Sequence, residues 1–334
     1  MIRNYLEISR LFNMGLTGVA PVLGALSMFS IGSLSLPQLF VLFVIGCFSH
    51  TYGFVLNDIF DIRLDQLSKD LAMRPLVNGS ITRRNATFFA FACLILSFIL
   101  TIFFYTKLNA YLIIVFVLMV AFVFATVYDV LSKKYPGMDL FVAGAVFFLI
   151  LFGASTVGRP SVLSWIVALI GGLQVLFMNM INGAIKDIDH DKDGRAHTVA
   201  IWLGAKVHAG IIALPLSFKS TGYLIEIGRM LLIFIPFTPF VTPSLSLSLW
   251  QIALLVIFEV LIFVSIYKLY SIKTFDRARI RKGIGIIVIF MYATTPIMLS
   301  SLNIFIILVA LVPPLWFFFS NLALHKTIFE PKTM

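Results

Sequence analysis

The chain has 334 residues, of which 60% are hydrophobic and 12% charged, with a formal net charge of +10 and a mean hydropathy of +1.03. This composition excludes a soluble globular domain and indicates a polytopic membrane protein. The positive charge is interpreted as a signal for orientation and for anionic lipid, and no soluble basic surface that would bind nucleic acid is predicted.

Ten apolar segments are long enough to cross about 30 Å of hydrocarbon. They lie near residues 14–32, 37–56, 86–106, 109–128, 140–157, 161–185, 222–243, 247–268, 284–301 and 303–323. The last two leave the count open at nine to ten helices. Since no linker divides the chain, residues 1–334 are expected to form a single membrane-embedded domain of the all-α class. The polar residues 1–10 show no cleavage pattern, so the first segment is expected to remain in the membrane.

Positive charge is distributed unevenly between the two sides of this predicted bundle. The loops on one side carry only Lys107 and Arg159 as basic residues, and the rest of the 25 Lys and Arg lie toward the other side. The positive-inside rule therefore predicts a multi-pass protein whose N-terminus and acidic segments face the cytoplasm. Membrane lipids are the expected surroundings, and no obligatory protein partner is inferred.

An acidic cluster follows the second apolar segment directly. Asn57, Asp58, Asp61 and Asp65 fall within an arc of about 100° if successive residues are about 100° apart, as in a helix. Three carboxylates on one face repel one another unless a cation lies among them, and Mg²⁺ prefers such oxygen ligands. Because Mg²⁺ commonly shares its coordination with substrate phosphates, Asp58, Asp61 and Asp65 are predicted to hold Mg²⁺ together with a phosphate or diphosphate.

Cations that a phosphate site would need lie in the next two loops on the same side. Lys69 and Arg74 follow the first cluster, and a proline and an Asn-Gly turn hold Arg74 in a loop, where its guanidinium could bind phosphate oxygens. Tyr128 and Lys133 follow the fourth segment. An ordinary role as a membrane anchor explains each cation equally well, but their convergence with acidic clusters favours a phosphate site.

A second acidic cluster follows the sixth apolar segment. Asp187 and Asp191 are four residues apart and share a helical face, whereas Asp189 would point to the far side of a continuous helix. The pair Asp187 and Asp191 is therefore predicted to bind metal, and Lys186 beside it to contact phosphate. The run from Asp189 to Gly194 also matches the start of an EF-hand, but Ala200 stands where that motif needs glutamate.

Four other polar residues fall within predicted membrane helices. His50 lies seven residues before Asn57 on the same face, where it could orient or deprotonate an acceptor, although an interhelical hydrogen bond is the commoner role. Glu259 lies near the middle of its helix and has either a role in the cavity or a structural hydrogen bond. Glu226 and Arg229 are expected to form a simple i, i+3 ion pair.

These motifs together resemble the UbiA-type intramembrane prenyltransferase superfamily over roughly residues 5–205. The resemblance is carried by the Asn-Asp-x-x-Asp-x-x-x-Asp pattern of 57–65, Arg74-Pro75-Leu76-Val77-x-Gly79, Tyr128 with Lys133, Asp187-x-x-x-Asp191 with Thr198 and Gly204, and Arg10 with Asn13 at the first helix. It implies a helical bundle around a central cavity, with two Asp motifs that hold a prenyl diphosphate through Mg²⁺ at the cytoplasmic end. Arg10, Asn13, Asn57 and Tyr128 are then candidates for substrate binding.

The implied reaction is transfer of an isoprenoid from a prenyl diphosphate to a lipophilic or aromatic acceptor, with release of pyrophosphate. Where the family often has a Lys-Asp-x-x-Asp-x-x-Gly-Asp run, this chain has additional aspartates, so Asp189 and Asp193 remain alternative ligands to Asp187 and Asp191. A terpene cyclase on the same fold is an alternative function. A transporter or binding protein for phosphorylated lipids is another, although transporters usually place their charges at the membrane midplane.

Overall fold

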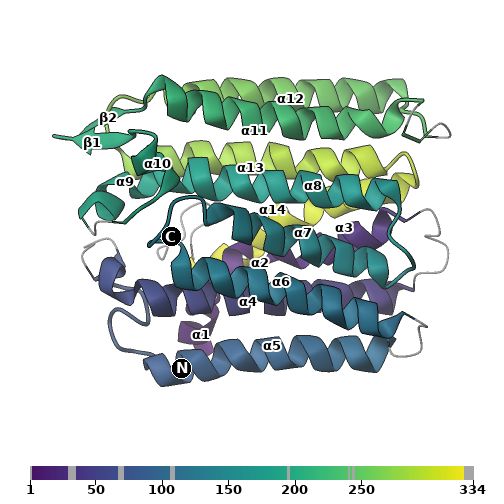
Figure 1. Cartoon of the computed structure of the whole chain (residues 1–334), viewed down its shortest axis with the longest axis horizontal. Coiled ribbons are helices and arrows are strands. Elements are labelled where there is room, and N and C mark those ends of the chain that lie inside the picture. Colours follow the sequence, from purple (N-terminus) through teal and green to yellow (C-terminus); the bar gives the residue numbers. More distant parts are fainter. Residues whose placement is uncertain are drawn as a thin grey trace.

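The computed structural model describes residues 2–28, 35–66, 71–105, 110–193, 196–239, 241–242 and 245–326. Within these ranges the chain forms one bundle of helices aligned along a common axis (Figure 1). The α-helices are α1 Ile2–Ile8, α2 Leu11–Gly18, α3 Ala20–Leu26, α4 Leu36–Asp65, α5 Arg83–Tyr105, α6 Tyr111–Leu131, α7 Asp139–Ser155, α8 Val162–Phe177, α9 Ala184–Asp193, α10 Val199–Trp202, α11 Leu216–Phe234, α12 Leu249–Tyr270, α13 Arg277–Leu299 and α14 Val312–His325.

Eight helical stretches of the described chain are long and apolar enough to cross a membrane. They are Leu36–Asp65, Arg83–Tyr105, Tyr111–Leu131, Val162–Asp189, Leu216–Phe237, Leu249–Tyr270, Arg277–Leu299 and Ile304–Leu324. Two shorter apolar helical stretches, Leu11–Leu26 and Asp139–Ser155, lie at the positions of the first and fifth predicted segments. The predicted all-α membrane bundle is thus confirmed, and every predicted segment contains helix within the described residues.

The two shorter stretches pack against each other with almost no space between their backbones. A Cβ atom on Gly24 of α3 would lie 1.8 Å from the carbonyl oxygen of Ile150 in α7, and one on Gly153 would lie equally close to that of Pro21. Only glycine permits this approach, which is how membrane helices gain dispersion energy in an apolar solvent. The contact fixes the first helix against the middle of the bundle.

Helix α4 is the longest element and runs from the far end of the bundle through the first acidic cluster. Ser35 and Gln38 begin it with a capping box, in which the Ser35 Oγ accepts from the Gln38 backbone and the Gln38 side chain accepts from Ser35. The helix ends at Asp65 rather than near residue 56, since the polar cluster continues the helical hydrogen bonding beyond the apolar segment. The aspartates of the first cluster therefore lie on a single continuous helix.

The second acidic cluster lies on α9, which is joined to α8 by a π-helical segment, Met178–Gly183. Such segments add a residue to a helical turn and are frequent near functional sites. Regular α-helix resumes at Ala184 and continues to Asp193, which is incompatible with the calcium loop considered from the sequence. Asp187 and Asp191 thus lie on one regular α-helix, one turn apart.

Residues 206–213 form a short antiparallel hairpin in place of helix. Strands β1, Lys206–His208, and β2, Ile211–Ala213, pair so that Val207 lies opposite Ile212, and Thr274 bridges to Ile211. The hairpin projects beyond α9 and α10 at the end of the bundle that carries the acidic clusters (Figure 1). The sequence patterns assigned no structure to this stretch.

The last helical region places the C-terminal part of the chain against the first helix. A 3₁₀ segment, Ile304–Leu311, leads into α14, and the Trp316 indole donates to the Leu11 carbonyl over 2.7 Å. Gly15 permits this contact, because a Cβ atom there would lie 2.7 Å from Trp316. Helix α14 therefore joins the first and last parts of the bundle.

A buried charged network connects α11, α12 and α13. The Arg229 guanidinium donates to Glu226 over 2.6 Å, to Glu259 over 2.7 Å and to Thr294 over 2.9 Å. Arg229 and Glu226 are fully buried. The ion pair between Glu226 and Arg229 expected from the sequence is confirmed, and Glu259 of the neighbouring helix binds the same guanidinium. Glu259 has a structural partner here, which the sequence left open.

Candidate functional site

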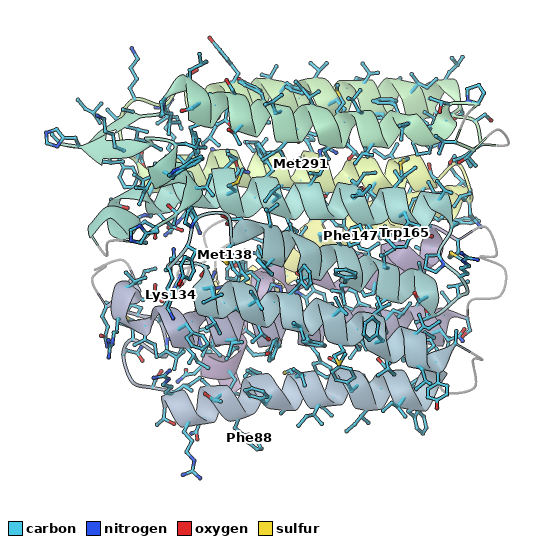
Figure 2. The ribbon with its side chains drawn as sticks, in the orientation of Figure 1. Phe88, Lys134, Met138, Phe147, Trp165 and Met291 are labelled. Atoms are coloured by element: carbon cyan, nitrogen blue, oxygen red, sulfur yellow. The ribbon has the colours of Figure 1, made fainter. Side chains whose placement is uncertain are left out.

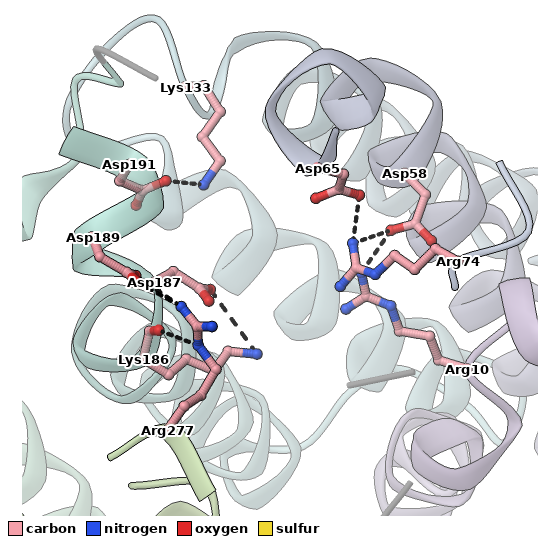
Figure 3. Close-up of polar contacts among 10 residues, drawn as sticks. All are labelled: Arg10, Asp58, Asp65, Arg74, Lys133, Lys186, Asp187, Asp189, Asp191 and Arg277. Carbon is pink, nitrogen blue, oxygen red and sulfur yellow. Dashed lines mark hydrogen bonds and ion pairs between the residues drawn. The ribbon is translucent and has the colours of Figure 1, made fainter. Parts of the chain in front are cut away.

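The two acidic clusters face each other at one end of the bundle. Figure 3 shows Asp58 and Asp65 of α4 on one side and the aspartates of α9 on the other, with Lys133, from the loop after α6, reaching toward them. The aspartates of α4 lie in its last eight residues, and α9 continues the apolar helix α8 through the π-helical segment, so both clusters lie at the same end of the bundle. An oxygen-rich region therefore lies at the mouth of an apolar bundle.

Arginines neutralise the first cluster. Arg10 donates to Asp58 over 2.6 Å, and Arg74 donates to Asp65 over 2.5 Å and lies 3.5 Å from Asp58. Both carboxylates are buried. The predicted requirement for a cation among these charges is thus met in this structure by two guanidinium groups, which come from segments on either side of α4 in the sequence.

Arg10 occupies the break between α1 and α2. Its backbone is left-handed, with φ 46° and ψ 52°, a conformation that is uncommon for a residue with a long side chain. Such backbone strain persists where surrounding contacts compensate for it. Here the compensating contacts are the ion pair with Asp58 and the stacking of the guanidinium over Phe54, 4.7 Å from the ring centre. The break therefore directs Arg10 into the site.

Asp61 differs from its neighbours in its partners. Within the described ranges it makes no ion pair or hydrogen bond, yet it interacts electrostatically with Lys133 and with the carboxylates Asp58, Asp65 and Asp191. It is half-buried on α4. In the first cluster, Asp58 and Asp65 are paired with arginines, whereas Asp61 has no ion pair in the described structure. Its charge interacts instead with Lys133 and Asp191 of the opposite side.

The second cluster divides between two faces of α9. Lys133 donates to Asp191 over 2.7 Å, and Lys186 lies 4.0 Å from Asp187. Arg277, at the start of α13, donates to both oxygens of Asp189 over 2.8 and 2.9 Å, and it also donates to the Lys186 carbonyl. Asp189 is turned to α13, whereas Asp187 and Asp191 are directed toward the space between the helices (Figure 3).

Lys133 is held in its charged form by the aspartates around it. Burial opposes the charge, but Asp191, Asp61 and Asp187 more than offset burial and raise the Lys133 pKa. The backbone of Lys133 is also fixed, because its carbonyl accepts from the His197 amide in the segment after α9. A permanent positive charge therefore stands between the two clusters.

The remaining predicted site residues lie near this region in different settings. Asn57 is half-buried and within hydrogen-bonding reach of Asp129, and Tyr128 is half-buried in the last turn of α6. Asn13 lies half-buried on α2. Lys69 lies outside the described residues.

His50 lies deeper in the bundle than the aspartates. Its Nδ1 atom is 3.0 Å from the Thr17 hydroxyl of α2, while Nε2 is buried and has no hydrogen-bond partner in the described structure. The interhelical hydrogen bond considered from the sequence is thus present on one ring nitrogen. The ring also lies close to the backbone of Ser9 and Arg10 at the break between α1 and α2.

The sequence did not predict the contacts of several polar groups of the site. Arg277 belongs to a basic stretch that reads as a membrane anchor, and nothing in its local pattern indicates a bond to Asp189. Asp129 is buried with Oδ2 unpaired, and Asn182 is buried in the π-helical segment with Oδ1 unpaired. Asp129 stands directly after Tyr128, where the resemblance to the family leads one to expect serine, and a carboxylate inside a membrane segment is rarely without a role.

The arrangement of the carboxylates suits a Mg²⁺ ion that shares its coordination with phosphate, and it does not suit a metal held by protein ligands alone. Among the described residues, no group of three or more Asp, Glu, His or Cys side chains is arranged to hold a metal ion by itself. Mg²⁺ in phosphate sites usually takes only one or two carboxylates, with water and phosphate oxygens completing its octahedron. Asp58, Asp61 and Asp65 of α4 and Asp187 and Asp191 of α9 offer such oxygens from two sides.

The UbiA prenyltransferase family model matches residues 18–283. The digeranylgeranylglyceryl phosphate synthase of Methanococcus aeolicus is 28% identical over 235 residues, which cover 69% of this chain and 74% of that protein. The synthase of the same name from Methanocaldococcus jannaschii is 26% identical over 265 residues, which cover 78% and 83%.

Solved structures share the fold. A UbiA homologue from Archaeoglobus fulgidus bound to GPP and Mg²⁺ superposes with a TM-score of 0.63 at 19% identity, covering 89% of this chain and 99% of that one. The apo structure of a UbiA homologue from Aeropyrum pernix gives a TM-score of 0.62 at 16% identity, covering 88% and 96%. At these identities the likeness establishes the bundle architecture.

Proposed function

The chain belongs to the UbiA prenyltransferase family, and we propose that it is a Mg²⁺-dependent enzyme that transfers an isoprenoid chain to a lipid acceptor and releases pyrophosphate. The observation that carries this proposal is the pair of facing aspartate clusters, each already accompanied by cations, at one end of an apolar bundle. The A. fulgidus relatives bound to GPP or DMAPP with Mg²⁺ support a prenyl diphosphate as donor.

We propose a glycerol phosphate lipid with a free hydroxyl as the acceptor. The M. aeolicus and M. jannaschii relatives are named for a glyceryl phosphate that carries two geranylgeranyl groups. The sequence predicted a lipophilic or aromatic acceptor, and the names of these relatives favour the lipophilic class. The acceptor oxygen would bond to C1 of the allylic chain, the C1–O bond to the diphosphate would break with its electron pair going to pyrophosphate, and the hydroxyl proton would leave.

Asp58, Asp61, Asp65, Asp187 and Asp191 would hold Mg²⁺ with the donor. When bound, Mg²⁺ neutralises the diphosphate and makes pyrophosphate a better leaving group. The cations of the site are proposed to exchange partners when the donor arrives. Arg10, Arg74, Lys133 and Lys186 each lie near an aspartate, so they could turn to the phosphate oxygens while the carboxylates would pass to Mg²⁺, and no buried charge would be left unpaired.

The cations also favour the transition state over the bound donor. Negative charge accumulates on the pyrophosphate oxygens as the allylic bond breaks, so charge-assisted hydrogen bonds from Arg74 and Lys133 strengthen at that moment. The aspartates around Lys133 raise its pKa, so its ammonium group is charged when the diphosphate arrives. The apolar bundle excludes water, which would otherwise trap the allylic cation as an alcohol.

His50, Asn13, Asn57 and Tyr128 are proposed to position the substrates. Nε2 of His50 would accept a hydrogen bond from the hydroxyl of the lipid substrate or donate one to it, according to the tautomer of the ring. The asymmetric distribution of basic loops supports a cytoplasmic location of this end of the bundle.

Chelation tests the metal requirement. Excess chelator should abolish prenyl transfer by the purified protein, and Mg²⁺ or Mn²⁺ should restore it. Zn²⁺ should restore it poorly, because Zn²⁺ prefers tetrahedral nitrogen and sulfur ligands. The measurement is product formation from a labelled prenyl diphosphate, with recovery after metal is added back as the control for an intact protein. Undiminished transfer in excess chelator would remove the role assigned to the aspartates.

A further inference from the structure

Two adjoining hollows lie on the outer face of α4 and α5, at the end of the bundle that carries the aspartates. One, of about 440 Å³, is lined by Ile59, Phe60, Ile62, Arg63 and Arg83. The other, of about 610 Å³, is lined by Arg83, Arg84, Thr87, Phe88 and Phe91. Arg83 borders both, so the hollows form one continuous surface, which we call the α4–α5 groove.

The groove combines three cationic groups with an apolar wall. Arg63, Arg83 and Arg84 are exposed, and none forms an ion pair with another described residue. The described lining includes no carboxylate. Phe88 is 77% exposed and projects from the outer side of α5 (Figure 2). Guanidinium groups bind phosphate oxygens through paired hydrogen bonds, and the phenyl rings would contact acyl chains.

We propose that the α4–α5 groove binds an anionic phospholipid of the surrounding membrane. Its phosphate would lie on Arg63, Arg83 and Arg84, and an acyl chain would follow Phe88 and Phe91 along α5. Charge complementarity carries this choice, because basic pockets at the cytoplasmic end of membrane helices are the usual binding sites of anionic headgroups. A zwitterionic lipid would bring a cation toward three arginines that have no acidic partner in the described structure.

The groove is distinct from the site between the aspartate clusters. Arg63 is two residues from both Asp61 and Asp65, so it points to the opposite side of α4. The aspartates face the bundle interior, and the arginine faces the lipid. A lipid held in the groove would therefore contact the outer face of the helical turn whose inner face carries the first cluster.

Native mass spectrometry of the purified protein with phosphatidylglycerol tests the proposal. The variant with Arg63→Gln, Arg83→Gln and Arg84→Gln should bind this lipid on the order of 10²-fold more weakly than the wild type, and Arg83→Gln alone roughly fivefold more weakly. Phosphatidylcholine should bind wild type and variants equally. Because the arginines are exposed, the variants should elute and unfold like the wild type without added lipid.

A matched control removes three exposed lysines elsewhere at the same end of the bundle. Lys206→Gln on the hairpin, Lys268→Gln in the last turn of α12 and Lys273→Gln in the segment after α12 change the net charge by the same amount. They should leave phosphatidylglycerol binding unchanged. Equal losses in the two triple variants would show a general charge effect and overturn the assignment of the groove. Failure of the wild type to retain phosphatidylglycerol over phosphatidylcholine would overturn it as well. Neither readout depends on prenyl transfer.

Discussion

Replacing Asp61 or Asp187 with asparagine should reduce prenyl transfer on the order of 10²-fold or more, whereas Asp189→Asn should retain most of the activity. Asp61 and Asp187 are directed to the space between the clusters and are proposed to hold metal in the transition state. Asp189 is turned to α13 and bound by Arg277. Each of the three changes removes one negative charge and leaves the side-chain volume nearly the same. Differences in activity among the variants therefore show the effect of the position of each carboxylate. Turnover of a labelled prenyl diphosphate provides the measurement.

Folding of the three variants is the control. Asp61 has no ion pair within the described structure and lies near three other carboxylates, so a neutral amide there removes repulsion and should not lower thermal stability. Asp187 is attracted to Lys186 at 4.0 Å, but this pair is partly exposed, so Asp187→Asn should lower thermal stability only slightly. If Asp189→Asn proves inactive while Asp187→Asn turns over normally, the metal ligands must be reassigned to Asp189 and Asp193.

Replacing Arg229 with methionine should lower the free energy of unfolding by about 3–5 kcal/mol. The change leaves Glu226 and Glu259 buried without their cation, in helices that contact lipid. Glu259→Gln should cost far less, because Arg229 and Glu226 remain as a neutral pair. Denaturation in detergent, followed by loss of helical signal, compares the two variants. Combining Arg229→Met with glutamines at 226 and 259 should recover part of the loss. If Arg229→Met and Glu259→Gln lowered the free energy of unfolding equally, the pairing of Arg229 with the two glutamates would not account for the stability of this region.

The helical periodicity of the sequence was enough to predict the parts of the site that lie on one helix. Asn57, Asp58, Asp61 and Asp65 were expected on one helix, and α4 carries them without interruption. The expectation that Asp189 points away from Asp187 agrees with its contact to Arg277, but its exclusion from the metal site stays a prediction. Helix positions followed from apolar length, since the hydrocarbon thickness fixes how many residues a span requires.

Contacts between distant segments could not be predicted from the same patterns. Arg10 reaches Asp58 across 48 residues, and Arg277 reaches Asp189 across 88, and in both cases the sequence shows only a basic residue near a membrane end. Glu259 and Arg229 lie on different helices, and only packing reveals which buried charges meet. The π-helical segment at Met178–Gly183 likewise leaves no mark on hydropathy, because it changes hydrogen bonding and not composition.

Mass spectrometry of the lipid products tests whether this site transfers a prenyl chain to a glycerol phosphate lipid. The purified protein, supplied with Mg²⁺, deuterated geranylgeranyl diphosphate and a geranylgeranylglyceryl phosphate acceptor, should form a lipid that carries the labelled chain on an ether oxygen. Pyrophosphate should be released in equal amount. A labelled hydrocarbon or terpene alcohol as the main product without acceptor would instead identify a cyclase, and a labelled donor recovered intact would contradict the assignment of prenyl transfer to this site.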